Sequence, residues 1–255
     1  MHMKINKILV ISVIVSTIFV NNDLLEAETV GYDFTGERIQ YGIQPVGKSE
    51  YNNLGTVDLK GVKASLLTIK SKILFVDVTE KIFYSPETSL PYRTERINSG
   101  LWIKEYRTEE YDQNKFTVVI KKFKGKNLIK VKEKVIKTNG PIQNMNTLLF
   151  YLRKQPNLKL GWHFTAKVPN ELELLELDLR LISIDEITVP AGKFQAYHFK
   201  SVPDTFEIWI DKRSPHVPLK IIVKGIVNCT ILMKDTAFIT NKLKRQDTIK
   251  SSDDT

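Results

Sequence analysis

Hydrophobic and polar side chains alternate along most of the chain. Between residues 36 and 225, a hydrophobic residue recurs at about every second position in stretches such as KASLLTIKSKILFVDVTEKIFY and LELDLRLISIDEITV. A period of two is typical of β-strands, because successive side chains point to opposite faces of a sheet. Turn residues interrupt the alternation at short intervals, a pattern that indicates an antiparallel sheet, sandwich or barrel.

The segment 116–136 predicts a β-hairpin. Phe116, Val118 and Ile120 share one face of its first arm, and the sequence KGKN at 124–127 supplies the turn. Lysines populate both arms of this hairpin. Charged side chains at such positions discourage sheets from pairing edge to edge.

A second hairpin is predicted in ITVPAGKFQAYHF, residues 187–199. Two alternating runs stand on either side of a Pro-Ala-Gly triplet. Proline fixes φ and glycine tolerates positive φ, so the triplet reads as a tight reversal that joins two strands. We therefore expect Gly192 to occupy a turn conformation that a residue with a Cβ disfavours.

The segment NMNTLLFYLRKQP breaks the two-residue period and predicts a helix over 146–155. Asn146 can cap its start, and Pro156 halts it. Its apolar side consists of Leu148, Leu149, Tyr151 and Leu152. A lone helix must bury its apolar side, and the concave face of the sheet is the natural partner. The predicted fold is therefore mainly β: a curved antiparallel sheet, or an open barrel or half-barrel, with one short helix packed on its concave face.

The chain begins with the features of a secretory signal peptide. Lys4 and Lys7 form a basic region, residues 8–20 form a mainly apolar run, and the small residue Ala27 closes a polar stretch. The apolar run is too short to span a bilayer, which takes about 20 residues. An uncleaved amphipathic anchor is the alternative. We expect cleavage near Ala27 and a periplasmic or secreted protein.

The remainder of the chain is consistent with a single domain. It shows no internal repeat and no linker rich in proline, glycine or serine. The final stretch TNKLKRQDTIKSSDDT has few apolar residues and no period, which predicts disorder. The predicted organisation is a signal peptide at 1–27, one β domain at 28–239 and a disordered tail at 240–255.

The chain is basic, with 38 Lys and Arg against 29 Asp and Glu and a formal charge of +9. Arginine, the residue favoured for bidentate phosphate recognition, contributes eight of the basic side chains. We therefore predict no nucleic-acid partner. The first hairpin could contact an anionic membrane surface through Lys121, Lys122, Lys124 and Lys126. A solvated strand face is the alternative explanation of this lysine run.

The sequence lacks the common motifs of catalysis and metal binding. It has no HExxH, CxxC, GxSxG or phosphate-binding glycine loop, and His163, His198 and His216 lack metal-ligand spacing. Cys229, the one cysteine, lies in an apolar strand pattern and reads as a buried thiol. The acidic residues of LELLELDL could supply an acid and a base, but a solvated strand face is the favoured explanation. We predict no catalytic residue, no metal site and no cofactor.

Four residues on or after the helix are candidate ligand contacts: Tyr151, Arg153, Trp162 and Phe164. Arg153 emerges beside aromatic residues and could meet an anionic head group. Its alternative role is that of a cation favoured by the dipole at the helix C-terminus. Trp162 and Phe164 either line a cavity or belong to the core.

Five segments occur in a characteristic order: GERIQYGI at 36–43, LPYR at 90–93, LLFYLRKQPNLKLG at 148–161, ITVPAGKFQAYHF at 187–199 and IWIDKRSPHVPLKI at 208–221. This ordered set resembles the bacterial envelope family catalogued as domain of unknown function 3108. The resemblance implies a secreted or periplasmic β protein without an established activity. A further analogy of fold is to lipoprotein carriers, in which a curved sheet holds a hydrophobic cavity plugged by a helix.

The leading hypothesis is a non-catalytic envelope protein that binds an apolar or lipid-like ligand between sheet and helix. One alternative is an envelope interaction or scaffold protein without a ligand cavity. The other is a hydrolase whose site is assembled from scattered carboxylates or histidines. A cavity, an exposed patch or a cleft with converging polar groups would distinguish the three.

Overall fold

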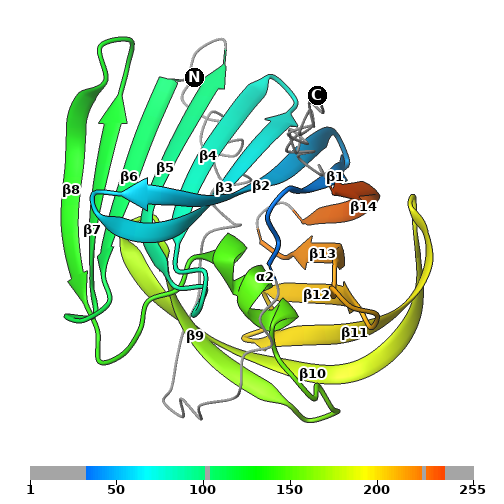
Figure 1. Ribbon diagram of the computed structural model, residues 1–255. Coiled ribbons are helices and arrows are strands. Elements are labelled where there is room, and N and C mark those ends of the chain that lie inside the picture. Colours follow the sequence, from blue (N-terminus) through cyan, green and yellow to red (C-terminus); the bar gives the residue numbers. More distant parts are fainter. Residues whose placement is uncertain (1–32, 101–103, 226–227, 239–255) are drawn as a thin grey trace, which may run out of the picture.

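The computed structural model describes residues 33–100, 104–225 and 228–238, and the predicted signal peptide and C-terminal tail lie outside them. Within these ranges, fourteen strands form one antiparallel sheet that is not closed, and one helix, α2, lies against it (Figure 1). The predicted fold class is confirmed. The strands are β1 Glu37–Gln44, β2 Gly47–Leu59, β3 Val62–Ile73, β4 Val76–Tyr84, β5 Pro91–Gly100, β6 Lys104–Asp112, β7 Thr117–Lys124, β8 Ile129–Lys137, β9 His163–Asn170, β10 Glu173–Val189, β11 Gly192–Val202, β12 Phe206–Asp211, β13 Pro218–Val223 and β14 Cys229–Phe238.

Except for β8 and β9, strands that follow one another in sequence are neighbours in the sheet, and one join connects strands that are far apart in the chain. The order runs from β8 down to β1, then from β14 down to β9. The join pairs β1 with β14, for example Gly42 opposite Leu232 and Ile43 opposite Ile231. Two meanders of short hairpins are thereby united into one sheet.

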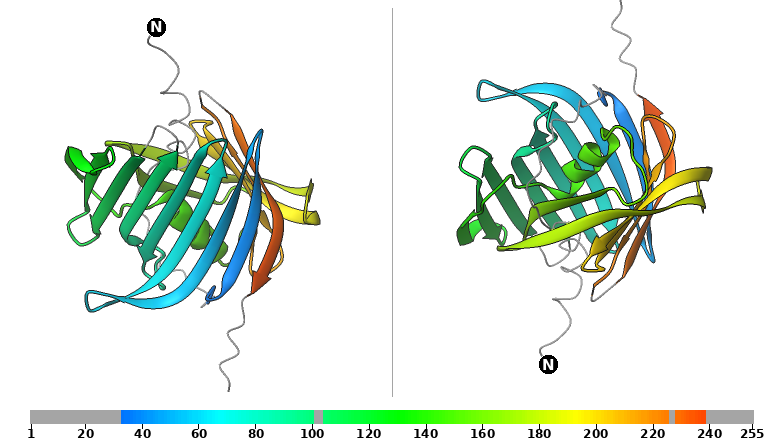
Figure 2. Two further views of the ribbon diagram at one scale, coloured as in Figure 1. Left: turned by 90° about the horizontal axis from the view of Figure 1, so that it is seen from above. Right: turned by 90° about the horizontal axis from the view of Figure 1, so that it is seen from below.

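The sheet curls around α2, which lies on its concave side (Figures 1 and 2). The end strands β8 and β9 share no ladder of hydrogen bonds. Side chains fill the seam instead: Leu172, in the turn before β10, and Leu174, in β10, pack against a buried cluster that includes Val118 and Ile120 of β7. Apolar packing therefore contributes to the seam, together with an ion pair between Lys122 of β7 and Glu171 of the turn before β10.

Helix α2 spans Met145–Arg153 and begins earlier than the sequence pattern predicts. Its N-cap is Asn144, whose backbone is extended and whose side chain accepts a hydrogen bond of 2.8 Å from the backbone N–H of Asn146. The prediction that Asn146 caps the helix is therefore wrong. The side chain of Asn146 instead accepts a hydrogen bond of 3.0 Å from the hydroxyl of Tyr51 on β2.

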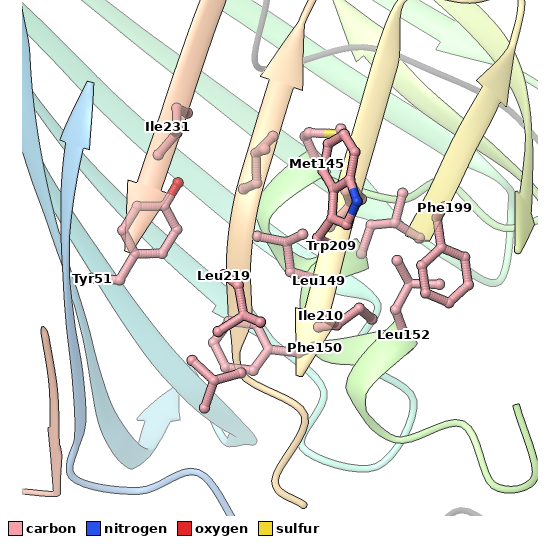
Figure 3. Close-up of a cluster of buried hydrophobic side chains, with 14 of the residues drawn as sticks. Tyr51, Met145, Leu149, Phe150, Leu152, Phe199, Trp209, Ile210, Leu219 and Ile231 are labelled. Atoms are coloured by element: carbon pink, nitrogen blue, oxygen red, sulfur yellow. The ribbon is translucent and has the colours of Figure 1, made fainter. Parts of the chain in front are cut away.

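The helix buries its leucines in the main core. Leu148, Leu149 and Leu152 are all buried, as predicted. Figure 3 shows side chains from α2 among those of β11, β12 and β13: Leu149, Phe150, Leu152, Phe199, Ile210 and Leu219. A nine-residue helix is marginal in water, so this burial stabilises its helical state.

Both predicted hairpins are present. Strand β7 ends at Lys124 and β8 begins at Ile129, so the first turn lies at 125–128. In the second, Val189 pairs with Gly192 across the Pro-Ala turn, and the φ of Gly192 is +134°. This φ belongs to the region that favours glycine, as the Pro-Ala-Gly triplet predicts.

Substitution of Gly192 by valine should lower the free energy of unfolding by about 1–3 kcal/mol through backbone strain. Steric overlap adds little, since the nearest atom to a Cβ at this position, on the Phe194 ring, is 3.7 Å away. Chemical denaturation would measure the change, with Ala191→Val at the neighbouring exposed turn position as the control. Equal denaturation midpoints for Gly192→Val and the parent protein would contradict this account of the turn.

Candidate functional site

The space between α2 and the sheet is nearly filled by side chains. One cavity beneath Leu149 and Phe150 has a volume of about 10 Å³, and another beside Asn146 and Tyr51 has about 50 Å³. Pockets for small ligands typically enclose roughly 300–1,000 Å³. A lipid-like ligand would fit in either place only if the helix moved away from the sheet.

Three of the four predicted ligand contacts form a packed aromatic cluster. The rings of Tyr151 and Phe164 lie 4.3 Å apart, and Trp162 meets Phe199 edge-on at 5.7 Å. All three predicted residues are half-buried and pack against the main core. Burial raises the pKa of Tyr151 to about 12. The cluster therefore covers the core, and the cavities that border α2 lie elsewhere.

The fourth predicted contact, Arg153, is bonded within the protein. Its two terminal nitrogens donate to the two carboxylate oxygens of Glu37 at 2.6 and 2.5 Å, and its Nε donates to the carbonyl of Pro215 at 3.1 Å. The guanidinium also lies 3.9 Å from the centre of the Phe34 ring. The Arg153 side chain is 1 % exposed and that of Glu37 is 2 % exposed. In this structure Arg153 is therefore engaged by partners within the protein, and a contact with a ligand head group stays a prediction.

The lysine run 121–126 divides between the two faces of the sheet. Lys122 points inward, where it pairs with Glu171 and lies 4.0 Å from Glu105. Burial lowers the pKa of Lys122 to about 8, against the opposing effect of Glu105. Lys122 is thus buried, whereas Lys124 and Lys126 are exposed and Lys121 is half-buried, and the membrane contact of this run stays a prediction.

Lys122 belongs to an inward-facing row of cations that carboxylates neutralise. Arg96 lies opposite Arg107, and Arg107 lies opposite Lys122, across β5, β6 and β7. Like charges at directly opposite positions destabilise a sheet. Each cation of the row has an acidic partner: Glu80 for Arg96 at 2.9 Å, Glu109 for Arg107, and Glu105 and Glu171 for Lys122.

A histidine cluster lies on the opposite side of the sheet, on β10, β11 and β12. The Nδ1 of His198 is 3.1 Å from an Asp185 oxygen and 3.2 Å from the Ser183 hydroxyl, and its Nε2 is 3.0 Å from Glu207. The imidazole stacks on Trp209 at 3.9 Å. Although burial raises the pKa of Asp185, hydrogen bonds from Ser183 and Trp209 and the nearby His198 hold it below its usual value.

Both ring nitrogens of His198 therefore face carboxylates. The cluster accounts for the buried position of Trp209 on the outward face, since His198 covers one side of the indole and Lys220 lies 4.2 Å from its ring centre.

Among the described residues, no group of three or more His, Cys, Asp or Glu side chains could hold a metal ion.

A groove of about 580 Å³ lies on the outward face of β14, β1, β2, β3 and β4. Its charged side chains on β1, β2 and β3 alternate in sequence with buried Ile39, Tyr51 and Ile69, so they point away from α2. Five cationic and two acidic side chains line the groove: Arg38, Lys48, Lys70, Lys72, Lys234, Glu50 and Asp77. The groove is therefore basic.

Three of these residues, which we call the lysine row, cross the sheet: Lys72 on β3, Lys48 on β2 and Lys234 on β14. Lys48 is directly opposite Lys72 on one side and Gly42 on the other. A Cβ at Gly42 would lie 2.6 Å from the Cε of Lys234, so the Lys234 side chain occupies the space above this glycine. The register between β1 and β14 shifts here and leaves Lys234 as the extra residue of a β-bulge, a device that redirects side chains.

The acidic side chains of the groove neutralise it incompletely. Lys72 lies 3.5 Å from Asp77, while Glu50 is occupied by Arg38 and Asn52, whose hydrogen bonds hold its pKa below the usual range. Across the part of the chain that the structure describes, Lys48, Lys70 and Lys234 take part in no ion pair. The inward row of cations has carboxylate partners, whereas this outward row presents its lysines to solvent and could bind an anion.

The family model described as "Protein of unknown function (DUF3108)" matches residues 88–226, more than half of the chain. The chain belongs to the DUF3108 family. The family predicted from the five sequence segments is thereby confirmed. The matched span begins before β5 and ends before β14, so the strands that line the groove lie outside it.

The fold of this DUF3108 protein is similar to the crystal structure of a beta-barrel-like protein of domain of unknown function DUF1849 from Brucella abortus. The TM-score is 0.50 at 7 % identity, and the match covers 79 % of this chain and 97 % of that chain. At this identity the likeness shows the fold alone. Among proteins with curated descriptions, none matches the sequence. No helix among the described residues is long and apolar enough to cross a membrane.

The lysine row was missed by sequence reasoning because its members are far apart in the chain. Each lysine occupies an ordinary outward position of an alternating strand, and such lysines are usually solvated. Two signals in the sequence were relevant: the glycine at position 42 within a strand, and the length of β14, which exceeds that of β1 by two residues. Neither signal identifies the register between β1 and β14 that brings Lys234 beside Lys48.

The buried pair of Arg153 and Glu37 yields a stability test. Glu37→Gln and Arg153→Met should each lower the free energy of unfolding by about 3–5 kcal/mol, because each leaves a buried charge without its partner. The double variant should lose much less than the sum of the two. Denaturation of the three variants would measure this coupling.

The exposed pair of Glu186 and Lys193, 3.9 Å apart, is the control for that experiment. Glu186→Gln should leave the denaturation midpoint unchanged, because exposed ion pairs contribute little. If the losses in the two single variants of the buried pair were simply additive, the pair would not act as a unit.

Proposed function

We propose that this DUF3108 protein is a non-catalytic binding protein of the bacterial envelope that takes an anionic ligand in the basic groove. The observation that carries the proposal is the lysine row, in which like charges stand side by side without carboxylate partners of their own at Lys48 and Lys234. The expected export rests on the N-terminal sequence pattern. The ligand class follows from charge and is that of phosphate-bearing or carboxylate-bearing molecules.

The size of the groove supports a small ligand or a head group. Its volume of about 580 Å³ lies within the range of roughly 300–1,000 Å³ that is typical of ligand sites. The groove is open and bordered by charged side chains, so a bound anion would keep part of its hydration. The cavities beside α2 are far smaller, which favours the outer groove over the sheet–helix interface as the place for a ligand.

Titration calorimetry with inorganic phosphate and pyrophosphate tests the proposal. We expect saturable binding that weakens as salt is added, because mobile ions screen exposed charges. Lys48→Gln and Lys234→Gln should each reduce the affinity for pyrophosphate about tenfold, in line with the loss of a hydrogen bond to a charged group.

Lys81→Gln provides the matched control. Lys81 is an exposed lysine of β4 on the same face of the sheet, and it lies outside the groove lining. Its substitution changes the net charge equally and should leave the affinity nearly unchanged. Equal losses in all three variants would show a general charge effect, and an absence of binding in the parent protein would refute an anion site.

A further inference from the structure

Two adjacent hairpin turns present apolar side chains to solvent at one rim of the sheet. Val46, in the turn between β1 and β2, is 53 % exposed. Leu74 and Phe75, in the turn between β3 and β4, are 41 % and 73 % exposed. The turns are neighbours because Gly47 at the start of β2 pairs with Ile73 at the end of β3.

The two turns also share a small apolar cavity. It has a volume of about 40 Å³ and is lined from both turns and from the start of β14: Ile43, Gln44, Pro45, Val46, Ile73, Leu74, Asn228 and Cys229. Val46 and Leu74 therefore border one apolar cavity, and Phe75 follows Leu74 in the same turn. We call these three exposed side chains the apolar rim: Val46, Leu74 and Phe75. Continuous apolar edges mark contacts with partners or membranes more often than isolated exposed residues do.

The residue types of the second turn are unusual for a solvent-exposed reversal. Leu74 has a φ of 54°, a left-handed conformation that glycine and asparagine adopt more readily. Leucine at this position, followed by a largely exposed phenylalanine, carries a conformational cost without gaining burial in the folded protein. A binding partner that covers the turn would account for both residues.

Cations stand directly behind the apolar rim. Lys48 follows Val46 by two residues, and Lys72 precedes Leu74 by two residues. At about 3.3 Å per residue, these lysines lie roughly 7–10 Å behind the ends of the turns. Apolar side chains of interfacial proteins enter the boundary of head groups and acyl chains to a depth of about 5–10 Å, which places flanking lysines at the level of the lipid phosphates.

We infer that the apolar rim docks on an anionic lipid bilayer, with Phe75 and Leu74 inserted and the lysine row against the phosphates. The inference rests on the proposed function, since Lys48 and Lys72 line the groove, and it names the head groups of such a bilayer as the anion. Charge complementarity favours an anionic bilayer over the other surfaces that could cover the rim. A second copy of the chain would bring two basic grooves toward each other, and a neutral surface would leave the lysines without a counterpart.

Co-sedimentation of the purified protein with vesicles tests the inference. We expect binding to vesicles of phosphatidylcholine and phosphatidylglycerol in equal amounts, and little binding to vesicles of phosphatidylcholine alone. The double substitution Leu74→Ser with Phe75→Ser should weaken vesicle binding at least tenfold. Lys48→Gln should weaken it about fivefold, the effect of one lysine at an anionic surface.

Ile184→Ser is the matched control for the apolar variant. Ile184 is a 40 % exposed residue of β10, away from the rim, and its substitution should leave vesicle binding intact. The rim variant should also retain its affinity for pyrophosphate, whereas Lys48→Gln should lose affinity for both pyrophosphate and vesicles. Unchanged denaturation midpoints would show that the substituted turns still fold.

The outcomes separate the two proposals. A parent protein that binds pyrophosphate but no vesicles would overturn the docking inference and leave the groove as a site for a soluble anion. A protein that binds neither would overturn both. Full vesicle binding by the rim variant would show that the apolar rim is not the surface that docks on the bilayer. A dimer that dissociates when the rim is substituted would show that a second copy of the chain covers the rim.

Discussion

The buried ion pair between Arg153 and Glu37 holds the helix against the sheet. It connects the last residue of α2 to the first residue of β1, a strand at the middle of the sheet. The planar guanidinium binds both carboxylate oxygens at once, so it fixes the orientation of the helix end as well as its position. A helix this short has little stability of its own, and the leucines that the sheet wraps around are presented only when it is held in place.

The same alternation of side chains creates two different electrostatic environments on the two faces of the sheet. On the concave side, the cations of β5, β6 and β7 have lost much of their hydration, and carboxylates within ion-pair distance make this burial tolerable. On the convex side, the lysine row remains in water, which screens its repulsion and makes a permanent counter-charge unnecessary. A surface of this kind is stable without a ligand and is nevertheless attractive to an anion.

Local patterns in the sequence predicted the local structure well. The alternating runs, the Pro-Ala-Gly reversal at Gly192 and the presence of the helix all depend on neighbours within a few residues, although the helix ends at Arg153, before the predicted residue 155. The features that the sequence did not predict depended on distant partners. The sequence does not distinguish Asn144 from Asn146 as the helix cap. The side chain of Asn146 is instead hydrogen-bonded by the hydroxyl of Tyr51 on β2, which is far away in the sequence. Arg153 meets a carboxylate near the start of the β domain. For the lysine run, strict alternation alone implies that Lys121 and Lys122 face opposite sides, and this reasoning was available from the sequence.

The seam between β8 and β9 has a consequence for how the fold accommodates change. In a closed barrel, the number of strands and their stagger fix the radius. Here the ladder stops at the seam, so the circumference follows from what fills the interior, namely α2 and the side chains around it. Bulkier side chains inside could widen the seam by shifting Leu172 and Leu174 against their buried cluster and by moving Glu171 relative to Lys122, without breaking any ladder of hydrogen bonds between strands. The internal volume is therefore a property that substitutions can adjust while the number of strands and their connections stay the same.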